Sequence, residues 1–154
     1  MKDNSMLEIL IADDDFDDRM LIEDAFLESK LRNPISFVEN GEELLDRLNC
    51  AGKFADKSPN NLPGLIILDL NMPRMDGREA LSRIKADPHL KLIPVVVLTT
   101  SKAEEDIVRT YDLGVSSFIQ KPVTFDGLVD VVRTLNRYWI EIVHLPPTTA
   151  RVAA

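Results

Sequence analysis

Short apolar runs alternate along this chain with segments in which apolar residues recur every three or four positions. Five runs have the length of β-strands, and the first, third and fourth are apolar almost throughout, as in parallel strands covered on both faces. The runs are Leu7–Ala12, Ile35–Val38, Leu65–Leu70, Pro94–Thr99 and Val115–Ile119. The strict alternation predicts an α/β fold, a doubly wound five-stranded parallel sheet of flavodoxin-like type with helices on both faces.

Four of the five predicted helices begin at a residue suited to cap them. The first is expected to begin at Asp15, and the fifth to run from about Thr124 to His144. The other three begin where a capping residue stands three positions before a glutamate. These pairs are Asn40 with Glu43, Asp76 with Glu79, and Ser101 with Glu104. The buried face of the first helix is predicted to carry Met20, Leu21, Ala25 and Phe26.

The length of 154 residues fits one domain. We expect it to span residues 1–145, with a core at about 6–143 and a disordered tail at 146–154. The polar, Pro/Gly-rich segment 49–64 is predicted to be a loop excursion from this domain.

The charge and hydropathy of the chain argue against several classes of function. The formal net charge is −8, and basic residues form no block, so we expect neither a nucleic-acid partner nor an anionic membrane surface. No apolar run approaches the ~20 residues that span a bilayer, and the N-terminus does not have the pattern of a signal peptide. Cys50 is the one cysteine, which leaves no disulfide framework. These features predict a cytoplasmic protein.

Acidic residues are concentrated at the end of the first apolar run, where residues 12–18 read ADDDFDD. The later ones suit a helix cap and first turn, because the helix dipole stabilises acidic side chains there. Asp13 and Asp14 precede the helix, and Asp69 stands at the end of the third run. These three would meet at the carboxyl edge of the sheet, where ligands bind in this fold class. Carboxylates placed together repel one another unless a cation lies among them, and oxygen ligands of this kind suit Mg²⁺.

Two further polar residues stand at the ends of predicted strands. Thr99 ends the fourth run, and Lys121 follows the fifth. A metal ion, an ammonium and a hydroxyl at one edge can together neutralise and bind the oxygens of a phosphoryl group. Asp69 then has the position of a carboxylate nucleophile. Each residue alone has an ordinary explanation, but the set from four strand ends favours phosphoryl chemistry.

The motifs carrying these residues resemble the response-regulator receiver domain of two-component signalling. They are LIADDD, LDLNMPRMDG, VVVLTTS and FIQKP, and the resemblance covers about residues 6–143. A narrower resemblance, in TTSKAEEDI, KPVTF and RYWIEIVHLP, is to the single-domain regulators that partner bacteriophytochrome histidine kinases.

The resemblance implies a role for each site residue. Asp69 would be the phosphoacceptor, with Thr99 and Lys121 contacting the phosphoryl group. The implied Mg²⁺ ligands are Asp14, Asp69 and the backbone carbonyl of Asn71, with Asp13 acting through water. Thr99 and Phe118 would form the switch pair, although a phenylalanine lacks the hydroxyl that some switches use.

Apolar residues on the predicted fifth helix exceed one face. A seam at spacings of three and four comprises Phe125, Leu128, Val132, Leu135, Trp139 and Ile142, and suits the core. The remaining apolar residues, Val129, Val131, Tyr138, Ile140 and Val143, widen the surface. Because an exposed apolar patch usually marks an interface, we expect a homodimer with Tyr138, Trp139, Ile142 and Val143 as candidate interface residues.

The expected function is that of a stand-alone response regulator. It would accept a phosphoryl group from a sensor histidine kinase, for which the narrower resemblance suggests a bacteriophytochrome, and it would catalyse only its own phosphorylation and dephosphorylation. A phosphatase or phosphotransferase of the haloacid-dehalogenase class would need an acid where Asn71 stands. A flavodoxin-type binder would need a glycine-rich phosphate loop. An unphosphorylated scaffold is the other alternative.

Overall fold

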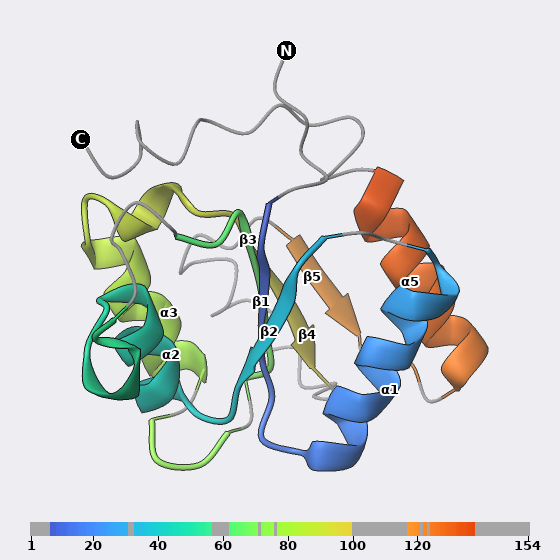
Figure 1. Ribbon diagram of the computed structural model, residues 1–154, viewed down its shortest axis with the longest axis horizontal. Coiled ribbons are helices and arrows are strands. Elements are labelled where there is room, and N and C mark those ends of the chain that lie inside the picture. The colour runs from blue at the N-terminus through green and yellow to red at the C-terminus, as the bar shows by residue number, and fades with distance from the viewer. Residues whose placement is uncertain are drawn as a thin grey trace.

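The computed structural model describes residues 7–30, 33–56, 62–70, 72–75, 77–99, 117–120, 122 and 124–137. These residues include a parallel sheet of five strands in the order β2-β1-β3-β4-β5 (Figure 1). The strands are β1 (Ile9–Ala12), β2 (Ile35–Val38), β3 (Leu65–Leu68), β4 (Val95–Thr99) and β5 (Ser117–Gln120). The predicted sheet is confirmed, although β1 begins later and β3 ends earlier than the apolar runs.

Helices cover both faces of the sheet, as Figure 1 shows. On one face lie α1 (Phe16–Glu28) and α5 (Phe125–Leu135), and on the other α2 (Gly41–Leu48) and α3 (Gly77–Ala86). Two short 3₁₀ helices, η2 (Gly52–Phe54) and η3 (Leu90–Leu92), follow α2 and α3. The helix predicted between β4 and β5 lies outside the described residues. Among the described residues, no helix has the length and apolar character to cross a membrane.

The buried side chains of the described residues form two clusters, one on each face of the sheet. Successive strand residues point to opposite faces, so Leu10 belongs to the cluster that contains Leu44 and Leu81, while Ile11 belongs to the cluster that contains Phe26 and Val132. A strand buried on both faces needs apolar residues at every position. This requirement explains the continuous apolar runs in the sequence.

The helix caps predicted at Asp15 and Asn40 form, and the structure shows a third cap at Thr124. The Asp15 carboxylate accepts hydrogen bonds from the N–H groups of Asp17 and Asp18, at 2.8 and 3.2 Å. The side chains of Asn40 and Thr124 accept from backbone N–H groups three residues on, at 2.8 and 3.0 Å. These bonds satisfy helix N-termini that would otherwise lack acceptors. The Asp76 and Ser101 caps lie outside the described residues.

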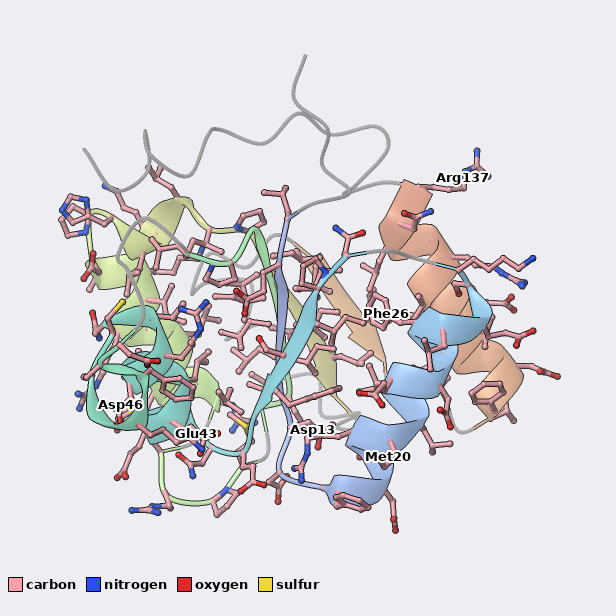
Figure 2. All side chains as sticks on the ribbon, in the orientation of Figure 1. Asp13, Met20, Phe26, Glu43, Asp46 and Arg137 are labelled. Carbon is pink, nitrogen blue, oxygen red and sulfur yellow. The ribbon has the colours of Figure 1, made fainter. Side chains whose placement is uncertain are left out.

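The buried face of α1 differs from the prediction. Ala25 and Phe26 are buried as expected, and Figure 2 shows Phe26 between α1 and the sheet. Ile22 is the third core residue, whereas Met20 and Leu21 are 42% and 44% exposed. The prediction was wrong because α1 carries apolar residues all around its axis, and only its docking against the sheet selects one face.

The apolar surface of α5 is narrower than the sequence indicated. Val129 is buried, and Val131 packs partly buried against the same core cluster, so neither contributes to an exposed patch. Phe125, the first residue of the predicted seam, is 39% exposed. The described α-helix ends at Leu135 and passes into a π turn through Arg137. The predicted extension to His144 and the four interface candidates lie outside the described residues.

Two adjacent residues of α1 provide a direct test of this packing. Phe26 is 2% exposed and Leu27 is 68% exposed. We expect Phe26→Ala to lower the free energy of unfolding by about 3–5 kcal/mol, because it leaves a cavity against the sheet. Leu27→Ala should change it by less than about 0.5 kcal/mol. Urea unfolding followed by circular dichroism measures both, and similar losses for the two variants would contradict the assigned face.

Candidate functional site

Three carboxylates meet at the carboxyl edge of the sheet. Asp13 and Asp14 follow β1, and Asp69 follows β3. The two strands are adjacent, and the last residue of one, Ala12, pairs with the last residue of the other, Leu68. The parallel register therefore carries the chain from both strands into the same place. One oxygen from each of the three carboxylates lies within 4.8 Å of the others.

The three side chains differ in their exposure. Asp13 is 2% exposed and Asp69 is 7% exposed, whereas Asp14 is exposed. Carboxylates that are close together and shielded from water are costly unless a cation balances them. A set made only of hard oxygen donors fits Mg²⁺ or Mn²⁺, which prefer carboxylates and water as ligands. The site is therefore an acidic site that fits a divalent cation, with Asp14 at its solvent side.

Backbone hydrogen bonds extend the sheet pattern into the site. The Asp13 N–H donates to the carbonyl of Val38 and the Asp69 N–H to that of Ala12, both at 3.0 Å. The Asp13 carboxylate accepts from the Asp15 N–H at 2.9 Å. One side chain that the sequence prediction missed also binds here, because Arg19 donates to the main-chain carbonyl of Asp13 at 2.8 Å. Its signal in the sequence was weak, a single arginine among the acids of α1.

Two glycines let the loop after Asp69 lie directly against helix N-termini. The Gly77 N–H donates to the Leu70 carbonyl at 3.0 Å, and a Cβ at Gly77 would lie 2.5 Å from the Asp69 carbonyl oxygen. The Gly41 N–H donates to the Met75 carbonyl at 2.8 Å, and a Cβ at Gly41 would lie 2.2 Å from that oxygen. No other residue type fits these contacts without backbone movement. The sequence signal was a glycine at the first position of each of two helices.

Of the other predicted site residues, the structure describes only the backbone of Thr99 and Phe118. Thr99 is the last residue of β4, at the same edge as Asp69, and Phe118 lies in β5 opposite Val97. The side chains of Thr99 and Phe118, together with Asn71 and Lys121, lie outside the described residues. The structure thus brings together the three acidic residues and leaves the proposed phosphoryl contacts as predictions.

Comparison with known proteins assigns the chain to a family. A family model described as the response regulator receiver domain matches residues 9–133, which include all three acidic residues and Thr99, Phe118 and Lys121. The chain belongs to the response-regulator receiver family. Response regulator Rcp1 from Synechocystis sp. is 37% identical over 138 residues, which are 90% of this chain and 92% of the relative.

Solved structures place this receiver near phytochrome-associated regulators. The crystal structure of the phosphorylated cyanobacterial phytochrome response regulator RcpA matches with a TM-score of 0.84 and 39% identity, covering 92% of this chain and 99% of that one. The Mn²⁺-bound form of Rcp1 matches with a TM-score of 0.82 and 35% identity, covering 91% and 99%. The bacteriophytochrome response regulator RtBRR matches with a TM-score of 0.74 and 36% identity, covering 96% and 88%.

The close approach at Gly77 can be tested with an alanine substitution, because helix propensity and steric contact predict opposite changes in the free energy of unfolding. Alanine is the better helix former by up to about 1 kcal/mol, so helix propensity alone predicts that Gly77→Ala stabilises the protein. We expect instead a loss of about 1–3 kcal/mol in the free energy of unfolding, because the new methyl group pushes on the backbone of Asp69 and Leu70.

Urea unfolding measures the effect of Gly77→Ala. Ser82→Ala, an exposed position in the same helix, is the matched control and should stay within about 0.5 kcal/mol of wild type. A Gly77→Ala variant as stable as wild type would show that the loop backbone moves freely.

Proposed function

We propose that this protein is a stand-alone response regulator that accepts a phosphoryl group on Asp69 from a sensor histidine kinase. The observation that carries the proposal is the convergence of Asp13, Asp14 and Asp69 within 4.8 Å at one sheet edge. The chain also spans 92% of Rcp1 and 99% of the RcpA structure, which supports a single receiver domain over residues 1–145 acting by itself.

The chemistry that we propose is an attack by one Asp69 carboxylate oxygen on the phosphorus of a kinase phosphohistidine. The new O–P bond forms as the N–P bond to the imidazole breaks, and the imidazole nitrogen keeps the electron pair. Because Asp69 is nearly buried and Asp14 exposed, the donor approaches from the Asp14 side. Lys121 and Thr99 would contact the phosphoryl oxygens as a cation and a hydrogen-bond donor.

A divalent cation is part of this proposal. The ligands would be Asp14, Asp69 and the Asn71 carbonyl, with Asp13 acting through water. Bound there, Mg²⁺ supplies positive charge that offsets the charge on the phosphoryl oxygens. The fit of the acidic site to a divalent ion supports this, as does the Mn²⁺ in the related Rcp1 structure.

The output that we propose is a conformational change rather than turnover of a substrate. Thr99 and Phe118 would be the switch pair, and they lie on the neighbouring strands β4 and β5. Loss of the phosphoryl group by hydrolysis at the same site would reset the switch. Two related structures are named as phytochrome and bacteriophytochrome response regulators, which supports a kinase of the phytochrome class as the partner. The proposed setting is the cytoplasm.

Phosphorylation can be tested without the kinase. We expect incubation with acetyl phosphate and Mg²⁺ to add one phosphoryl group, measured by intact mass, and a chelator to abolish the adduct. Asp69→Asn should show none, because an amide is not a carboxylate nucleophile. Asp17→Asn is the matched control, an exposed acid in the first turn of α1, and should be phosphorylated like wild type. The absence of an adduct on wild type would contradict the proposed function.

The proposed homodimer can be tested by sedimentation velocity over a range of concentrations. We expect the double variant Tyr138→Ala, Trp139→Ala to weaken association by about 2 kcal/mol or more, which is roughly thirtyfold in the dissociation constant, because buried aromatic residues dominate interface energies. Leu27→Ala removes an exposed apolar residue from α1 and should leave the dimer unchanged. A wild-type protein that stays monomeric at every concentration would disprove the dimer.

A further inference from the structure

Arg19 joins the acidic loop to the end of a neighbouring strand. Its guanidinium Nη1 donates to the main-chain carbonyl of Asp13 at 2.8 Å, and Nη2 binds the Glu39 carboxylate at 3.2 Å. The Arg19 side chain is only 13% exposed, and its guanidinium lies 5.7 Å from the centre of the Phe16 ring. These contacts attach the guanidinium to the backbone of the acidic site through the Asp13 carbonyl.

The contact fixes a peptide that the acidic site depends on. Asp13 donates its N–H to the Val38 carbonyl, and its carboxylate accepts from the Asp15 N–H. Its carbonyl, which belongs to the peptide joined to Asp14, is the group that Arg19 binds. Figure 2 shows Asp13 at the end of β1, beside α1. Rotation of this peptide would redirect the side chains of both acids, so Arg19 restrains the direction in which each carboxylate points.

We propose that Arg19 is a positioning residue for the divalent-cation site. It holds the Asp13–Asp14 peptide so that both carboxylates converge with Asp69 on one ion, against the mutual repulsion that would drive them apart. The proposal rests on the proposed function only in treating the three acids as cation ligands. Removing a residue that contacts a metal ligand, but not the metal itself, commonly lowers the metal affinity by about 10- to 100-fold.

The direction in which metal affinity changes distinguishes a positioning role of Arg19 from a purely electrostatic effect of its charge. A guanidinium near the site repels a divalent cation, so an electrostatic effect alone predicts tighter metal binding when Arg19 is neutralised. Positioning predicts weaker binding for the same substitution. Arg19→Gln removes the charge and the forked donor, whereas Arg19→Lys keeps the charge with a single ammonium.

A surface ion pair is the other explanation for this arginine. Glu39 is 61% exposed, and pairs of that kind contribute little to stability. Glu39→Gln would weaken the ion pair and leave the Asp13 contact in place. If Arg19 acts through Asp13, this variant should bind metal like wild type.

The test is a Mn²⁺ titration of the full chain, with free Mn²⁺ followed by electron paramagnetic resonance. We expect the dissociation constant to rise about tenfold in Arg19→Gln, by a smaller factor in Arg19→Lys, and not at all in Glu39→Gln. Arg83→Gln is the matched control, because this exposed arginine pairs with Glu79 on α3. Thermal unfolding of each variant confirms that the titrations are made on folded protein. An unchanged or lower dissociation constant in Arg19→Gln would overturn the proposal.

The Mn²⁺ titration and the phosphorylation experiment together distinguish failure of the Arg19 proposal from failure of the proposed function. If Arg19→Gln does not fold, Arg19→Lys decides, and a dissociation constant equal to wild type in that variant overturns the proposal. Wild type that binds Mn²⁺ but takes no phosphoryl group from acetyl phosphate contradicts only the proposed function. Arg19→Gln that binds Mn²⁺ like wild type, while wild type is phosphorylated, contradicts only the role of Arg19. Wild type without Mn²⁺ binding contradicts both.

Discussion

The parallel pairing of β1 with β3 determines where the acidic site forms. It sets Ala12 beside Leu68, so the residues that follow each strand arrive at one place. A slip of one residue would turn the apolar side chains of a strand to the opposite face. Both strands are buried on both faces, and the two core clusters therefore hold the register. The position of the acidic site follows directly from the packing of the core.

The acidic site brings three carboxylates that repel one another close together at the edge of the sheet. Asp13 and Asp69 are nearly buried, and Asp14 brings a third carboxylate to within 4.8 Å. A divalent cation bound there would offset the repulsion between these carboxylates. The carboxylates that repel one another are therefore also the donors that suit the site to a hard divalent cation.

Contacts with the backbone, rather than the acidic side chains themselves, hold the loops around this site in position. Gly41 and Gly77 let two helix N-termini approach the loop after Asp69 so closely that a methyl group would collide with the backbone. Arg19 binds the main-chain carbonyl of Asp13. Glu39, which follows β2, binds Arg19, and Gly41, the first residue of α2, binds the Met75 carbonyl. The carboxylates of a rigid site lose less conformational freedom on binding an ion.

Features that depend on neighbours in the chain could be predicted from the sequence. Strands followed from continuous apolar runs, and the caps at Asp15 and Asn40 followed from side chains that reach an N–H three or fewer residues away. The convergence of the three acids also followed, because parallel strands end at one edge. Contacts between segments that are distant in the sequence could not be predicted, because they form only when the helices dock on the sheet. The burial of Ile22 in place of Met20 and Leu21, the burial of Val129, and the roles of Arg19 and Gly41 depend on how helices dock, which a local pattern does not encode.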